Sequence, residues 1–271
     1  MHSNLGRLFI KTLHDQRGAI LGYGLGTALY AGAMLAFYPS MRSFTGLSDL
    51  MESYPDALKA FFAGQEAWRD FASLNGFLSL EFFSLAPLIF AIFTCNSAAH
   101  LVSGEEEKGT LDLLLSNPLP RWRLVLEKYA ALLVSLLLIC LLAAAGVLVG
   151  AAAFAHEDKV SYGGLTAQCL NLLPLALLFG TMTFLATAFV RRRVAMGIGM
   201  GLTFAAYLWN GLSPAVKSLR PYQKISPFYL YQPMEVYRSG LDWGGVGLLL
   251  GLSLLFLLIS LPLFQRKDLG V

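Results

Sequence analysis

Six long apolar segments constrain what this chain can fold into more than any other feature. They lie at 19–38, 77–99, 129–155, 165–190, 194–212 and 244–264. An apolar helix of about 20 residues crosses a hydrocarbon core of about 30 Å. Of the 271 residues, 56% are hydrophobic and only 14% are charged, which is too few charges to coat a soluble globule of this size. The pattern predicts an all-α membrane protein with six transmembrane helices in a single domain, 1–271.

The distribution of lysine and arginine predicts that both chain ends face the cytoplasm. In that orientation 12 of the 20 lysines and arginines lie on the inner side. Arg191, Arg192 and Arg193 alone separate the fourth and fifth segments, and short loops dominate this rule. The first segment begins only at residue 19 and lacks a small-x-small cleavage site, so we expect a retained helix and a multi-pass protein of the plasma membrane.

An amphipathic helix is predicted at 1–18, ahead of the first apolar segment. Leu5, Leu8, Phe9 and Leu13 recur at helical spacing, with Ser3 or Asn4 available as N-cap. Such a helix lies along the inner interface of the membrane. Two roles remain open for it, a simple anchor and an elbow that contacts a cytoplasmic partner.

A dense polar interruption, VSGEEEKGTLDLLLSNPLPRWRLVLEK at 102–128, separates the second and third apolar segments. Glutamates at 105–107 favour the N-terminus of a short helix, and the prolines at 118 and 120 end it before another helix begins near Arg121. The product is a short stiff helix with an acidic end and a leucine patch, projecting into the cytoplasm. From shape alone, the patch either folds back on its own chain or docks on a partner.

The residues of this loop also resemble a known pattern, GExExGTLxxLLxxPxxRxxxxxxK. The matching residues are Gly104, Glu105, Glu107, Gly109, Thr110, Leu111, Asp112, Leu114, Leu115, Pro118, Arg121 and Lys128. The pattern is typical of type-2 ATP-binding-cassette (ABC) transporter permeases, and the C-terminal PLFQRKDLGV and the six-span layout resemble that family too. The chain departs from the pattern at Glu106, where a basic residue is common, and at Glu127, which precedes Lys128 where Gly-Lys is common.

The resemblance implies a coupling helix at 105–116, within a coupling loop at 102–121, seated in a groove of a separate ATPase subunit. The residues implied in coupling are Glu105, Glu106, Glu107, Gly109, Thr110, Leu111, Leu114, Leu115, Pro118 and Arg121. The chain would be the permease of an exporter in a bacterial or archaeal inner membrane. It would work with a cytoplasmic nucleotide-binding ATPase, which binds ATP and Mg, and with a second permease, either a copy of itself or a related chain.

Catalytic motifs are missing from the sequence. There is no GxxxxGK[ST] loop and no Gly-Lys dipeptide, so we expect that this chain binds no nucleotide and no other cofactor and is not an enzyme. His156 and Glu157 lack the second histidine of an HExxH site, and Cys95, Cys140 and Cys169 show no metal-binding spacing. No basic block with interleaved aromatic residues indicates nucleic acid.

Four polar residues of the apolar segments are candidates for a transport pathway: Glu81, Asn96, Asn171 and Asn210. The alternatives are a headgroup position for Glu81 and simple helix packing for the asparagines. Pro87 and Pro174 are predicted to kink the second and fourth helices. Four GxxxG pairs begin at residues 22, 146, 197 and 247 and allow close helix contact within or between subunits.

Two long outer segments, 39–76 and 213–243, are predicted to form a gate, with passive docking at the interface as the alternative. The apolar lining favours an amphiphilic, peptide or drug-like substrate. Two other functions are weighed against an ABC exporter. An ion-driven secondary transporter would need midplane charges on broken helices. A non-transport assembly or signalling protein would use the leucine patch for a different partner.

Overall fold

The computed structural model describes residues 6–43, 53–55, 68, 70–101, 121–156, 158–216 and 218–266, and every regular element in these ranges is a helix. The elements are α1 (Arg7–Arg42), α5 (Leu74–Glu81), α6 (Ala86–His100), α9 (Arg121–Phe154), α10 (Tyr162–Leu170), α11 (Leu172–Ala186), α12 (Arg192–Leu212), η1 (Ser213–Ala215), η2 (Arg220–Ile225), η3 (Pro227–Leu230), α13 (Pro233–Ser239) and α14 (Trp243–Arg266). The prediction of an all-α membrane protein is confirmed.

Four helices are long and apolar enough to cross a membrane: Leu8–Arg42, Trp122–Phe154, Tyr162–Ala186 and Trp243–Gln265. The pair α5 and α6, bent by 40°, makes a fifth candidate if it is counted as one span. The predicted fifth segment forms α12, which is not among the candidates because its glycines and the polar residues near its end dilute its apolar run. Six spans are therefore not confirmed, and the structure supports four or five.

No boundary separates the predicted amphipathic helix from the first span. The single helix α1 follows Gly6, whose φ of 85° suits glycine, and it runs unbroken to Arg42. Its only proline is Pro39, near its end, so nothing in the sequence interrupts it at residue 18. Ser3 and Asn4 lie outside the described residues, and the interfacial position of residues 7–18 stays a prediction.

The second span is broken between α5 and α6, with Pro87 in the first turn of α6, as the predicted kink requires. A break frees backbone carbonyls, which are costly in a membrane unless they are paired. The Tyr30 hydroxyl of α1 donates to the Glu81 carbonyl, and the Tyr231 hydroxyl donates to the Phe83 carbonyl at 3.1 Å. Hydroxyl groups from two distant segments thus stabilise the break.

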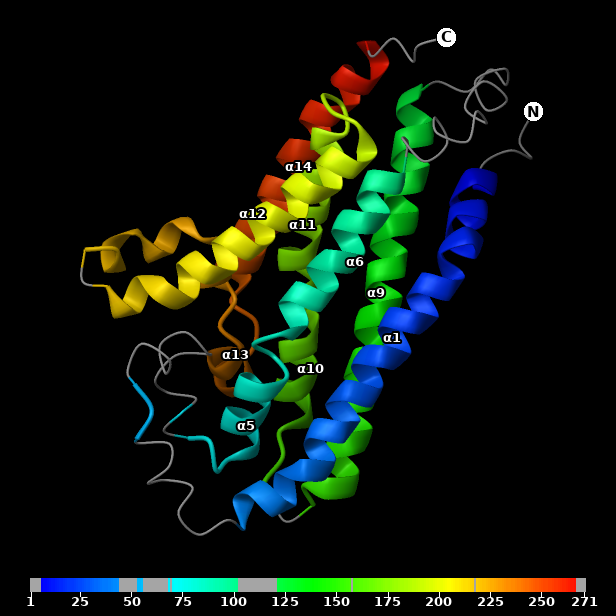
Figure 1. The fold of residues 1–271 in the computed structure, drawn as a ribbon. Helices are drawn as coiled ribbons and strands as arrows, with labels where there is room; N and C mark the ends of the chain where they lie inside the picture. The colour runs from blue at the N-terminus through cyan, green and yellow to red at the C-terminus, as the bar shows by residue number, and fades with distance from the viewer. Residues whose placement is uncertain are drawn as a thin grey trace.

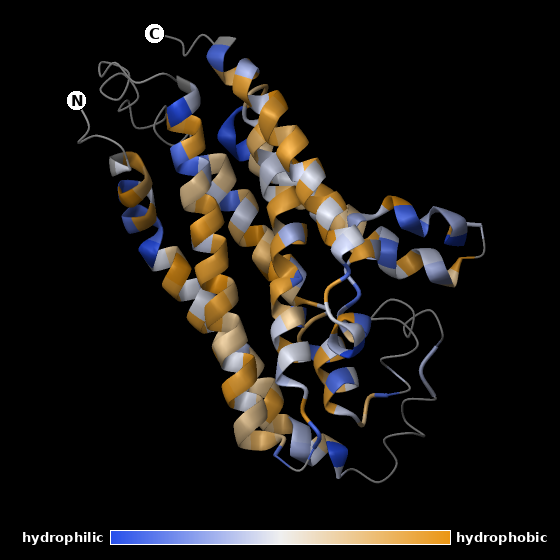
Figure 2. Cartoon of the chain, turned by 180° about the vertical axis from the view of Figure 1, so that it is seen from behind, coloured by the Kyte–Doolittle hydropathy of each residue, from blue (hydrophilic) through white to orange (hydrophobic). Residues whose placement is uncertain are grey.

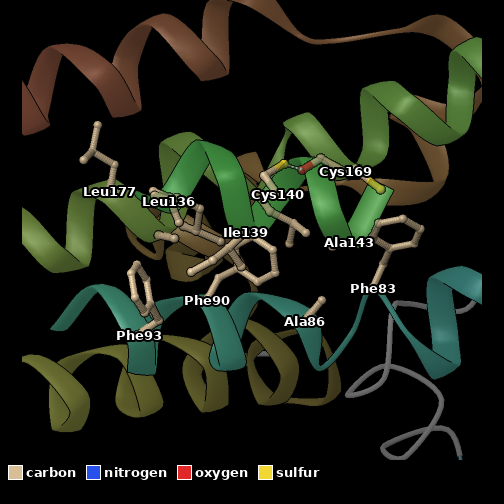
Figure 3. Close-up of a cluster of buried hydrophobic side chains, with 14 of the residues drawn as sticks. Phe83, Ala86, Phe90, Phe93, Leu136, Ile139, Cys140, Ala143, Cys169 and Leu177 are labelled. Atoms are coloured by element: carbon tan, nitrogen blue, oxygen red, sulfur yellow. Dashed lines mark hydrogen bonds between the residues drawn. The ribbon is translucent and has the colours of Figure 1, made fainter. Parts of the chain in front are cut away.

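The core lies where α6 meets α9, α10 and α11. In Figure 3, Phe90 and Phe93 of α6 point toward Leu136 and Ile139 of α9. The span that contains α11 is 72% buried, which makes it the centre of the bundle. The helix α1 packs along α9 on one side, and α14 packs on α11 on the other.

The bundle has two distinct ends (Figure 1). One end, drawn at the top of Figure 1, is called the base end here. It holds the start of α1, the end of α6, the start of α9, the α11–α12 turn and the end of α14. The opposite end, which we call the α13 end, holds α5, α10 and α13. Apolar residues predominate along the long helices, and hydrophilic residues are more frequent near their ends (Figure 2).

Candidate functional site

The predicted coupling residues from Glu105 to Pro118 lie outside the described residues, as does the side chain of Arg121. The structure instead describes the two helix ends on either side of this segment, which we call its frame. The end of α6 leads into it and the start of α9 leads out of it, and both lie at the base end (Figure 1). The site is therefore built from the residues that fix these two helix ends.

Lys128 joins the two helix ends directly. Its ammonium group donates to the carbonyl oxygen of Leu101 at 2.7 Å, across 27 residues of sequence. Leu101 follows the last turn of α6, where free carbonyls and the helix dipole favour a cation. Only 4% of Lys128 is exposed, so this charge contact is shielded from water and is stronger than a surface contact.

Arg192 joins the end of α6 to the α11–α12 turn. Its guanidinium group lies 2.8 Å from Nδ1 of His100, the last residue of α6. Arg192 opens α12 and belongs to the arginine triplet that the sequence places between the fourth and fifth segments. The triplet thus contacts the frame of the predicted coupling segment, which sequence reasoning did not anticipate.

The first turns of α9 beyond Lys128 contact two further helices. The Tyr129 hydroxyl is hydrogen-bonded to the Thr181 hydroxyl of α11, and the Ser135 hydroxyl donates to Oε1 of Gln16 on α1 at 2.8 Å. Five helices, α1, α6, α9, α11 and α12, are therefore linked by side-chain contacts close to the base end. A displacement of the start of α9 would reach all of them.

Glu127 is the departure from the family pattern that lies beside this frame. Its Oε2 atom is buried and has no hydrogen-bond partner in the described part of the chain. A buried carboxylate oxygen without a partner is costly. Compared with the glycine that is common at this position of the pattern, glutamate therefore requires a hydrogen-bond donor and occupies more volume.

The four pathway candidates do not meet in one place. Glu81 is half-buried at the end of α5, Asn96 is half-buried on α6, and Asn171 is buried between α10 and α11. Asn210 on α12 accepts a hydrogen bond from Gln223 at 3.3 Å. No hydrogen bond joins any two of the four, all of which are described, so a shared pathway site remains a prediction.

A polar cluster that sequence reasoning missed lies at the α13 end. Asn75, Ser79 and Gln168 are buried and hydrogen-bonded to one another. The available signal was Gln168 itself, a glutamine inside an apolar segment, since such residues are seldom placed in membranes without a partner.

Metal-ligating side chains do not gather in the described ranges: no group of three or more His, Cys, Asp or Glu residues could hold an ion there. Cys140 and Cys169 are buried thiols, and the Cys140 thiol donates to the Cys169 carbonyl at 3.1 Å (Figure 3).

Comparisons with known proteins agree with this architecture. A search of curated proteins finds no match. The family described as "ABC-2 family transporter protein" matches residues 19–269, so the match covers every predicted span as well as the loop at 102–128. The resemblance seen in the sequence is confirmed over nearly the whole chain, which belongs to the ABC-2 transporter family as a membrane-spanning permease subunit.

Proposed function

We propose that this permease belongs to an exporter and transmits the energy of ATP hydrolysis from a separate ATPase subunit to a pathway across the membrane. ABC permeases pair with ATPase subunits. The observation that carries the proposal is the contact of Lys128 with Leu101, because it clamps the two ends of the predicted coupling segment together. A push on residues 105–116 would then move α6 and α9 as one unit.

The proposed orientation places the base end in the cytoplasm. Arg191, Arg192 and Arg193 lie at that end, and Arg191 and Arg193 are exposed there (Figure 1). Positive charges in short loops favour the cytoplasmic side. In this orientation both chain termini and the predicted coupling segment face the ATPase, and α12 serves as the fifth of six transmembrane helices.

The mechanism is mechanical. Two permeases, copies of this chain or related chains, work with two ATPase subunits that bind ATP and Mg. Closure of the ATPase pair displaces the coupling helix, and the contacts of Lys128 and Arg192 pass the displacement to α6, α9 and α12. The membrane helices then rock as bodies and open a path to the outside for an amphiphilic, peptide or drug-like substrate.

Co-purification of the permease with its ATPase tests the coupling assignment. Leu114→Asp or Leu115→Asp places a charge in the predicted docking patch and should release the ATPase while the permease stays folded. Val216→Asp, at an exposed apolar position directly after η1, is the matched control and should keep the ATPase bound. Unchanged association in the two coupling variants would refute the docking assignment.

Vesicle transport separates the proposal from its two alternatives. Inside-out vesicles that hold the permease and the ATPase should accumulate substrate only when ATP is supplied. Accumulation driven by an ion gradient without ATP would instead identify a secondary transporter. ATPase binding without any transport would identify an assembly or signalling protein.

A further inference from the structure

The elements of the α13 end are tied to one another by buried polar side chains. Nε2 of Gln168, on α10, lies 3.0 Å from Oδ1 of Asn75 on α5 and 2.8 Å from the carbonyl oxygen of Pro233 on α13. Nδ2 of Asn75 donates to the carbonyl of Met234, also on α13, at 3.2 Å. Both amides thus reach the first turn of α13 from different helices.

The partners fix the orientation of these two amides. A backbone carbonyl can only accept, so the amide nitrogens of Gln168 and Asn75 must face Pro233 and Met234. Gln168 and Ser79 are fully buried, and Asn75 is 5% exposed, so the bonds form away from water. A buried donor that loses its acceptor costs more than an exposed one, and the cluster therefore resists opening.

Further contacts tie α13 to the same two helices. The backbone N–H of Ser161, the N-cap of α10, donates to the Tyr237 hydroxyl at 2.9 Å. A Cβ at Gly164 of α10 would lie 2.5 Å from the Tyr237 carbonyl oxygen, so only glycine permits this approach. Arg238 pairs with Asp70, just ahead of α5, at 3.4 Å.

The elements η3, α6, α11 and α12 are tied to one another by contacts of their own. The ring of Phe228 on η3 packs at 5.6 Å from Phe179 of α11 and at 5.5 Å from Tyr207 of α12. The Ser226 hydroxyl donates to the Ala206 carbonyl of α12 at 2.8 Å. In addition, α6 packs on α11 and α12. Before Tyr231 and Gln232, η3 therefore contacts α11 and α12, and after them α13 contacts α5 and α10.

Three interruptions separate the two sets of elements. The second span is broken at residues 82–85, and residues 231–232 join η3 to α13 without helical structure. In the fourth span the single turn residue Asn171 separates α10 from α11, although its own backbone angles stay helical. The Tyr231 hydroxyl bridges two of them, since it donates to the Phe83 carbonyl. Burial raises the pKa of Tyr231 well above its usual value, which keeps this donor protonated.

We propose that α5, α10 and α13 form one unit, which we call the α13 body. This unit moves as a whole relative to α6, α11 and α12, and the motion takes place at the three interruptions. Gln168 is the positioning residue that holds the unit together. The inference rests on the proposed function in one respect only: in an exporter, the α13 body would be the gate at the outer end. Its internal cohesion is a property of the permease alone.

Hydrogen–deuterium exchange of the full-length permease in lipid nanodiscs, without ATPase or nucleotide, tests the proposal. Gln168→Met keeps the length of the side chain but removes the donor that α5 and α13 share. We expect backbone exchange in α5, α10 and α13 to rise together by roughly tenfold, because two buried hydrogen bonds are lost. Exchange in α6 and α11 should stay within twofold of the unsubstituted protein.

Gln223→Met is the matched control: in the described part of the chain the side chain of Gln223, on η2, bonds to Asn210 of α12, so the change should leave exchange in α13 unchanged. Asn75→Ala provides a second route to the same loosening if Gln168→Met fails to fold. Faster exchange in α13 alone, or an equal rise throughout the bundle, would overturn the α13 body. Failure of the ATP-driven mechanism would appear instead as unchanged ATPase association in Leu114→Asp, and it would leave these exchange rates as they are.

Discussion

The helices α9 and α14 look alike in sequence but are held in the bundle in different ways. Both are long and leucine-rich, and each carries one GxxxG pair. In the structure 44% of the apolar window of α9 is buried but only 22% of that of α14. A shared composition and a shared motif therefore do not determine how much of a helix is buried in the bundle.

The difference begins at the glycines. A Cβ at Gly146 of α9 would lie 2.5 Å from the Cα of Ala28, because α1 crosses there in backbone contact. At Gly247 and Gly251 of α14 a Cβ would meet no atom within 4 Å. The spacing permits close approach of two helices, and a neighbouring surface of matching shape decides whether the approach occurs.

The ends of the two helices differ as well. Near its base end, α9 carries Lys128, and beyond its other end Asp158 accepts from the Tyr38 hydroxyl at 2.7 Å and pairs with Arg42 at 3.1 Å. The described contacts of α14 include the stacking of Phe264 on Phe184 at 4.8 Å and a cap by Asp242. The helix α9 is therefore held along its length and at both ends, whereas most of the apolar window of α14 is not covered by the rest of the described chain.

The largest expected effect is that of Gly146→Leu. The leucine side chain would collide with the backbone of α1, which cannot move aside as a flexible side chain can. We expect a loss of about 3 kcal/mol in the free energy of unfolding, measured in nanodiscs by denaturant titration. Stability equal to that of the unsubstituted protein would show that α1 and α9 are not packed as closely as described.

Lys128→Met should have the next largest effect. It removes the buried donor of the Leu101 carbonyl, and a charged hydrogen bond of this kind stabilises a protein by about 2 kcal/mol. Since the bond joins the ends of the proposed coupling segment, we expect the fraction of permease that co-purifies with ATPase to fall as well. Arg123→Met, one turn earlier on α9, removes a cation that lies over the Trp122 ring and serves as the control. Equal ATPase recovery in both variants would contradict the role given to Lys128.

Hydropathy and charge predicted much of this architecture, because apolar length is written directly in the sequence. They located most of the apolar helices, while Pro87 indicated the kink in the second span and the residue pattern at 104–128 indicated the family. The sequence did not reveal that the Tyr231 hydroxyl would reach the break in the second span, 148 residues away, or that Gln168 would join three elements. Such contacts depend on how separate helices are placed in space, and a single sequence contains no local signal for that placement.

A smaller effect is expected at the start of α14. The carboxylate of Asp242 accepts from the N–H groups of Gly244 and Gly245 at 3.0 and 3.2 Å, an N-cap that stabilises the first turn. Asp242→Ala should cost about 1 kcal/mol and raise amide exchange over the first turn of α14 only. Asp242→Asn retains a capping oxygen and should behave like the unsubstituted protein. Faster exchange along the whole of α14 would mean that the cap holds more of the helix than its first turn.

The smallest effect is expected for Gly247→Leu, which makes the same chemical change as Gly146→Leu at a position with open space around it. Because leucine is a better helix former than glycine, the helix itself loses nothing by the change. We expect a change in unfolding free energy within about 0.5 kcal/mol, measured in the same titration. In both variants a glycine of a GxxxG pair in a leucine-rich helix is replaced by leucine. The difference between their unfolding free energies therefore isolates the contribution of the neighbouring helix. A loss as large as that of Gly146→Leu would place an unseen surface against α14 and remove the distinction between the two helices.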